Sequence, residues 1–167
     1  MAPQLADSAR STRQLSAVDG LVQLSFLIQN ALAARAEEVD LSLIQTRLLG
    51  VLRDRVSTIN ELASYLDLDK SSVSGLISRA ERRGVVERVA SAADRRVVVV
   101  RITSKGRSLV NKVGAAFEGD VARLLALVSP RDATTLARVT SHLLVRHAEF
   151  HGVDLFPRVG VSMVSRT

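Results

Sequence analysis

Residues 57–84 read STINELASYLDLDKSSVSGLISRAERRG and carry the start and stop signals of two consecutive helices. Thr58 and Glu61 have capping-box spacing, in which each side chain bonds the other residue's backbone amide at a helix start. After the turn DLDK, either Asp69 or Ser71 can cap a second helix, which we expect to end near Arg83 because Gly84 follows it. The segment therefore predicts two short helices joined by a tight turn.

The second of these helices is expected to have two chemically different faces. At about 100° per residue, one face collects apolar side chains and predicts a core contact. Serine is a mediocre helix former, so a merely solvated face, the alternative interpretation, would favour Glu, Lys and Gln. We therefore expect the polar face to enter a DNA major groove and to offer donors to bases and phosphates. The apolar face comprises Val73, Leu76, Ile77 and Ala80, and the polar surface comprises Lys70, Ser71, Ser72, Ser74, Gly75, Ser78, Arg79 and Arg82.

A β-hairpin is predicted next, from strand-like runs at 85–89 and 96–103 joined by ASAAD. Arg95 and Arg96 stand before four consecutive valines, where arginines can also act as gatekeepers against strand aggregation. Asp94 favours a further role, because an acid two residues before Arg96 can orient its guanidinium through a charge-assisted hydrogen bond. An oriented arginine on a projecting tip suits a narrow minor groove. The middle of the chain thus predicts a helix-turn-helix with a wing.

The distribution of charge agrees with a polyanion partner. Residues 69–107 hold ten Lys and Arg against four Asp and Glu, which accounts for the whole net charge of +6 in the 167-residue chain. Excess positive charge in one contiguous segment is typical of a module that binds nucleic acid.

Helices are also predicted on both sides of this module. We expect them at about 15–38, at 42–55, from Thr103 or Ser104 to about 128, and from Ser129 and Pro130 to His147 or Phe150. The tail from Gly152 is not assigned. The first helix and the last two are apolar on more than one side, so they need more cover than one chain of this size offers. They predict a homodimer.

Residues 59–110 resemble the MarR (multiple antibiotic resistance regulator) family of winged helix-turn-helix transcription factors. The most specific part is the Asp94-x-Arg96 wing, followed by Thr103 and then Gly106. The resemblance implies a mainly α (α+β) fold, with an N-terminal arm at 1–40, a DNA-binding module at 41–106 and a C-terminal dimerisation region at 107–167. It implies DNA contacts by Ser71, Ser72, Ser74 and Arg79 of the recognition helix and by Arg96 of the wing, with Asp94 as its orienting partner. Gly75 stands where relatives often carry a larger side chain, Ala80 where leucine is usual, and the wing lacks a common proline or asparagine.

The resemblance further implies a homodimeric repressor that binds a palindromic operator in double-stranded DNA and is released by a small aromatic acid between its arms and its DNA-binding module. Arg47, Arg53 or Arg55 can meet such a carboxylate, but solvated arginines are the simpler interpretation, so no effector residue is assigned. The alternative is an effector-independent, architectural DNA-binding dimer.

Other chemistries find little support in the sequence. There is no cysteine, no glycine-rich phosphate loop and no nucleophile or paired-carboxylate motif, so we expect no enzyme and no cofactor. His147 and His151 have the spacing of two ligands on one helix face, but no third ligand is evident and no metal site is assigned. No signal peptide is visible, and Gln23, Ser25, Gln29 and Asn30 interrupt the most apolar stretch, so we expect a cytoplasmic protein that does not enter the membrane.

Overall fold

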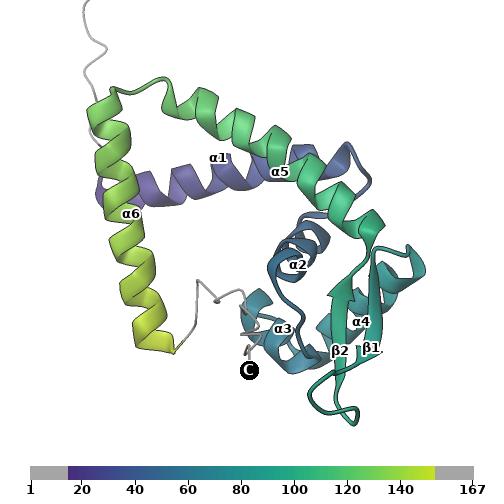
Figure 1. Cartoon of the computed structure of the whole chain (residues 1–167). Coiled ribbons are helices and arrows are strands. Elements are labelled where there is room, and N and C mark those ends of the chain that lie inside the picture. The colour runs from purple at the N-terminus through teal and green to yellow at the C-terminus, as the bar shows by residue number, and fades with distance from the viewer. Residues whose placement is uncertain (1–14, 153–167) are drawn as a thin grey trace, which may run out of the picture.

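The computed structural model describes residues 15–152, which form helices around one β-hairpin (Figure 1). The predicted mainly α class is confirmed. The predicted tail from Gly152 lies almost entirely outside the described residues. The elements are α1 (Ala17–Glu37), α2 (Leu43–Asp54), α3 (Ile59–Leu66), α4 (Lys70–Arg82), β1 (Val86–Ala90), β2 (Val98–Ile102), α5 (Ser104–Leu125) and α6 (Pro130–His151).

The helix starts follow the capping signals in the sequence. Thr58 and Glu61 form the predicted capping box at the start of α3, with the Thr58 amide donating to Glu61 Oε2 at 2.7 Å. Of the two candidates for the start of α4, Asp69 is the cap, because its carboxylate accepts the Ser72 amide at 2.9 Å. The turn between them uses Asp67, whose φ of 53° ends α3 in a left-handed conformation.

The hairpin is antiparallel, with Val86 paired to Ile102 at its base and Ala90 to Val98 near its tip. On the other edge of β2, Ser57 makes a single bridge to Val100 through backbone bonds of 2.7 and 3.2 Å. The second strand begins at Val98 rather than at the predicted Arg96. The reason is a turn at the tip, in which the Val97 amide donates to the Asp94 carbonyl at 2.9 Å.

The core lies between α2, α3, α4 and the inner face of the hairpin. The predicted apolar face of α4 is confirmed, because Val73, Leu76, Ile77 and Ala80 are all buried. They share one buried cluster with Leu48, Leu49, Leu52, Leu62, Leu66, Val85, Val86, Val100, Ile102 and Val110. The recognition helix predicted from the sequence is thus fixed on its apolar side and open on its polar side.

A tight junction links α4, the hairpin and α5. The Thr103 hydroxyl caps α5 by accepting the Gly106 amide at 3.1 Å, and it donates to the Gly84 carbonyl at 2.7 Å. Gly84 has a φ of 69°, which ends the preceding helical turn. A Cβ on Gly106 would lie 2.1 Å from the Val85 carbonyl oxygen, so only glycine allows this approach. We call residues 84–85 and 103–106 the α4–wing–α5 junction.

The long helices extend away from this module (Figure 1). α1 packs against α5, and Arg35 of α1 forms a double hydrogen bond with Asp120 of α5, at 2.7 and 2.8 Å. Ala148 is the one buried residue of α6. Large apolar side chains remain exposed on both terminal helices: Val18, Leu21, Val22, Phe26 and Leu27 on α1, and Leu136, Val139, Leu143, Leu144, Val145 and Phe150 on α6.

Within the described part of the chain, α1 is the one helix whose length and composition would let it cross a membrane. None of the residues in the 18-residue apolar stretch of α1 that meets this criterion is buried. A helix that is covered by a second protein surface has the same composition.

Replacing Gly106 by alanine tests the junction. We expect Gly106→Ala to lower the free energy of unfolding by about 2 kcal/mol, because the new methyl group meets a backbone carbonyl that cannot rotate away. Gly114→Ala, in the same helix with open space around its Cβ, should instead raise it by about 0.5 kcal/mol. Urea unfolding of both variants at one protein concentration measures the difference, and equal effects would contradict the close approach.

Candidate nucleic-acid interface

The polar surface of α4 is largely exposed. Lys70, Ser71, Ser72, Arg79 and Arg82 are exposed, and Ser74 is half-buried. The buried stripe on the other side holds the helix by its apolar face, as amphipathic spacing requires. The predicted contact residues of α4 therefore share one accessible surface, although Ser78 on this surface is bonded to other residues of the chain.

Asp69 organises the first turn of α4. Its carboxylate accepts the hydroxyls of Ser71 and Ser72, the latter at 2.6 Å, in addition to the Ser72 amide. These bonds, first the one from Ser71, hold the pKa of Asp69 well below its usual range, so the carboxylate is charged at neutral pH. A phosphate group that accepts either hydroxyl has to displace it from Asp69.

Ser78 lies at the contact between α4 and the hairpin. Its hydroxyl donates to the Ser74 carbonyl at 2.9 Å and accepts from Arg88 Nη2 at 3.1 Å. Arg88, on β1, also pairs with Glu81 of α4 through its Nη1, and its amide donates to Glu81 Oε1 at 3.3 Å. These three side chains form what we call the α4–β1 clamp.

The small residue at position 75 leaves space that Arg79 occupies. A Cβ built on Gly75 would lie 3.4 Å from Arg79 Nη1, so the guanidinium lies back along the helix over the glycine. A larger side chain at position 75 would push this guanidinium away. Gly75 thus affects the polar surface through the position of Arg79.

The wing tip corrects one expectation. The Asp94 carboxylate accepts the backbone amide of Arg96 at 2.9 Å, and it makes no ion pair with the Arg96 guanidinium. The amide two residues ahead is fixed at a short distance by the turn, and this is a common bond for aspartate. Asp94 therefore shapes the turn, while Arg95 and Arg96 extend from it as exposed side chains.

The ten cations of the basic segment divide into two groups. Five bond to acids or carbonyl groups of the chain itself: Arg83 to the Asp40 carbonyl, Arg88 to Glu81, Arg101 to Glu87, Lys105 to the Arg83 carbonyl and Arg107 to the Arg53 carbonyl. The other five form no side-chain hydrogen bond or ion pair with the described residues: Lys70, Arg79, Arg82, Arg95 and Arg96. The unpaired cations all belong to the exposed face of α4 or to the wing tip.

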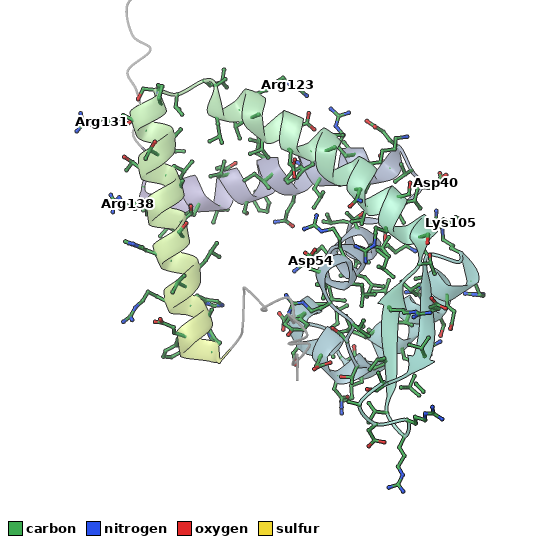
Figure 2. All side chains as sticks on the ribbon, in the orientation of Figure 1. Asp40, Asp54, Lys105, Arg123, Arg131 and Arg138 are labelled. Atoms are coloured by element: carbon green, nitrogen blue, oxygen red, sulfur yellow. The ribbon has the colours of Figure 1, made fainter. Side chains whose placement is uncertain are left out.

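The remaining candidates of the sequence lie elsewhere. The His147 and His151 rings are 4.4 Å apart between centroids on α6, and no group of three or more His, Cys, Asp or Glu among residues 15–152 is arranged to hold a metal ion. Arg53 pairs with the neighbouring Asp54, and the Arg55 guanidinium lies over the Tyr65 ring, 4.4 Å from its centroid. Asp54 lies on the side of the module that faces α1 and α6 (Figure 2).

An exposed second helix with a hairpin wing beside it defines a winged helix-turn-helix protein. Residues 39–97 match the model of the MarR family. This match agrees with the resemblance seen in the sequence over α2, α3, α4 and the first strand of the hairpin.

Solved structures share this fold. MarR from Escherichia coli superposes with a TM-score of 0.69 at 20% identity, over 78% of this chain and 98% of that one. MepR, a transcription regulator of the Staphylococcus aureus multidrug efflux pump MepA, gives 0.66 at 20% identity, over 79% and 98%. A variant of MepR bound to an oligodeoxyribonucleotide gives 0.56 at 20% identity, over 80% and 99%. No match was found among curated proteins.

The α4–β1 clamp can be tested by Arg88→Met, which keeps the aliphatic stem and removes the guanidinium. We expect the free energy of unfolding to fall by about 1 kcal/mol or less, because the pair is partly exposed. Amide hydrogen exchange should rise in β1 and β2, which lose their side-chain link to α4. Arg146→Met, which removes an exposed pair with Glu149 on α6, is the matched control. Unchanged hydrogen exchange in the hairpin of Arg88→Met would contradict the inference that the α4–β1 clamp stabilises the hairpin.

Proposed function

We propose that this protein is a sequence-specific regulator of transcription that binds double-stranded DNA as a homodimer. The main support for the proposal is the division of the ten cations of residues 69–107 into five that bond within the chain and five that do not. The inward-facing five stabilise the module, whereas Lys70, Arg79, Arg82, Arg95 and Arg96 leave five positive charges on two adjacent projections. Two basic projections beside each other match the major and minor grooves of one duplex.

The proposed contacts divide between grooves. The exposed face of α4 enters the major groove, where Ser74 and Arg79 meet base edges and Lys70, Ser71, Ser72 and Arg82 meet phosphates or bases. Arg96 enters the minor groove, with Arg95 beside it on a turn shaped by Asp94. Ser78 acts indirectly, by holding α4 against the wing.

The second half of the proposal is the homodimer. Residues 1–40 and 107–167 would form the dimerisation region around the DNA-binding module at 41–106. The exposed apolar side chains of α1 and α6 support this, because single copies rarely leave such large faces to water. A two-fold dimer presents two copies of α4, which suits a palindromic operator.

The proposed outcome is repression that a small aromatic acid relieves. MepR is a transcription regulator of this fold, which favours regulation over the alternative of an architectural DNA-binding dimer. The groups brought together here bind rather than react, so we propose neither catalysis nor a cofactor. A cytoplasmic location follows from contact with DNA.

Selection of bound duplexes from a random pool tests the function. We expect one palindromic sequence to be enriched and to bind at least a hundredfold more tightly than random duplex at the same salt concentration. Compounds that release the chain from the selected duplex then test repression by an effector. Equal affinity for selected and random duplexes would overturn the regulator and favour the architectural dimer.

Replacing Arg96 by alanine tests the wing. We expect Arg96→Ala to weaken binding to the selected duplex and to lower the slope of log affinity against log salt by about one, because one cation fewer displaces counterions. Arg131→Ala, an exposed arginine on α6, should leave both quantities unchanged. Filter binding at several salt concentrations measures them, and an unchanged slope in Arg96→Ala would remove the wing from the interface.

Light scattering tests the dimer. We expect a particle of twice the 18.0 kDa chain mass at micromolar concentration. Leu143→Asp on α6 should reduce it to the single-chain mass without unfolding, because this side chain is already 54% exposed in one copy. Val98→Asp, 51% exposed on the wing, is the control that should keep the dimer. A stable monomer of the unmodified chain would contradict the proposed assembly.

A further inference from the structure

The two serine hydroxyls in the first turn of α4 both donate to one carboxylate. Ser72 Oγ lies 2.6 Å from Asp69 Oδ2, and Ser71 Oγ bonds Asp69 Oδ1. The direction of both bonds follows from chemistry, because an ionised carboxylate carries no proton and can only accept. A serine hydroxyl has one proton and two lone pairs. With its proton bonded to Asp69, each serine oxygen has only lone pairs left for another partner.

Both serines are exposed, so these lone pairs are accessible to a bound duplex. An oxygen that donates to a charged acceptor becomes a stronger acceptor itself. Phosphate oxygens only accept hydrogen bonds, and so do guanine N7 and O6 and thymine O4. The major-groove donors are the amino groups at cytosine N4 and adenine N6. The first turn of α4 therefore complements an amino group of a base and opposes a phosphate.

The rest of the polar surface of α4 has the opposite character. The Ser74 hydroxyl forms no hydrogen bond with the described residues, so its proton remains available to DNA. The exposed cations only donate: Lys70, Arg79 and Arg82. Acceptor character on this helix is thus confined to the two serines that Asp69 bonds.

We propose that Asp69 determines sequence specificity, by making Ser71 and Ser72 acceptors that bind the amino group of a cytosine or an adenine in the major groove. The serines contact the base, and Asp69 is a positioning residue. Binding to random duplex consists mainly of phosphate contacts, which these oxygens do not favour. Specificity is a difference between two affinities, and a contact that disfavours the wrong duplex increases it. This inference deepens the proposed function and rests on it.

Asp67 provides a matched control for the charge of Asp69. Both aspartates are exposed, and both line a hollow of about 630 Å³ at the turn between α3 and α4. The Asp67 carboxylate forms no hydrogen bond or ion pair with the described residues. Its φ of 53° is also accessible to asparagine. Asp67→Asn therefore removes one negative charge from the same turn and leaves the serine bonds intact.

The two asparagine variants separate the bonds from the charge. Asparagine caps helices about as well as aspartate, but it has one side-chain oxygen and no charge, so Asp69→Asn frees serine protons for phosphates. We expect the ratio of selected-duplex affinity to random-duplex affinity to fall about tenfold in Asp69→Asn. Asp67→Asn should change both affinities by the same factor. Filter binding at one salt concentration measures the ratios, and equal ratios in the two variants would overturn the role of Asp69.

Methylated bases test which atoms the serines bind. N4-methylcytosine and N6-methyladenine lose the amino hydrogen that faces the major groove and still form base pairs. We place one of them at each base pair of the selected half-site in turn. At one position at least, methylation should lower affinity about tenfold in the unmodified chain and in Asp67→Asn. The sensitive base then shows whether cytosine or adenine is bound.

The double variant Ser71→Ala, Ser72→Ala separates a lost hydrogen bond from a steric clash with the added methyl group. Alanine favours the helix, and circular dichroism checks the fold. This variant should bind the sensitive duplex and its methylated form equally. A methylation effect of the same size in the double variant, or no sensitive position in the unmodified chain, would overturn the proposed base contact.

A measurement without DNA distinguishes this inference from the proposed function. Carbon NMR titration should give Asp69 a pKa well below its usual range, and this pKa should rise in the double serine variant. An ordinary pKa in the unmodified chain would overturn the inference and leave the regulator standing. Selection of a palindrome with equal ratios in Asp69→Asn and Asp67→Asn would do the same. A chain that selects no duplex would overturn the proposed function and this inference with it.

Discussion

The contact between Gly106 and the Val85 carbonyl constrains the rest of the structure. It brings the end of α4, the base of the hairpin and the first turn of α5 to one point, where the Thr103 hydroxyl also reaches the Gly84 carbonyl at 2.7 Å. Because backbone rather than flexible side chains makes this contact, α5 leaves the module in a fixed direction. The direction of α5 in turn sets where α1 and the exposed apolar faces lie. The geometry of the proposed dimer thus depends on one glycine.

Local signals predicted much of this fold. The capping pairs at Thr58 and Ser129 set helix starts, and the helical spacing of Val73, Leu76, Ile77 and Ala80 identified the buried face of α4. These features depend on residues within one or two turns of each other, so they can be predicted from the sequence without knowledge of the fold. Strand ends were less accurate: the Asp94 turn keeps Arg95 and Arg96 out of β2, and turn bonds compete with strand pairing at such positions.

The candidate site depended more on contacts between distant segments. Ser78 has the spacing of the polar face, but Arg88, ten residues away, draws its hydroxyl to the wing. Half of the cations in the basic segment bond to groups that the sequence does not place beside them, as Lys105 does with the Arg83 carbonyl. Net charge therefore identified the module, whereas only the fold separates the cations that hold it together from those that face outward.

The exposure of α6 affects how stable the protein is in a cell at low abundance. A helix with one buried residue out of 22 gains little free energy from its own chain. If a second copy covers α6, as proposed, the fraction of chains in which α6 is folded rises with protein concentration. A newly made chain at low abundance then presents uncovered leucines to chaperones and proteases, and it becomes durable only once copies meet. The regulator would accumulate steeply above a threshold of synthesis, so that its own dosage, as well as any ligand, determines when it acts.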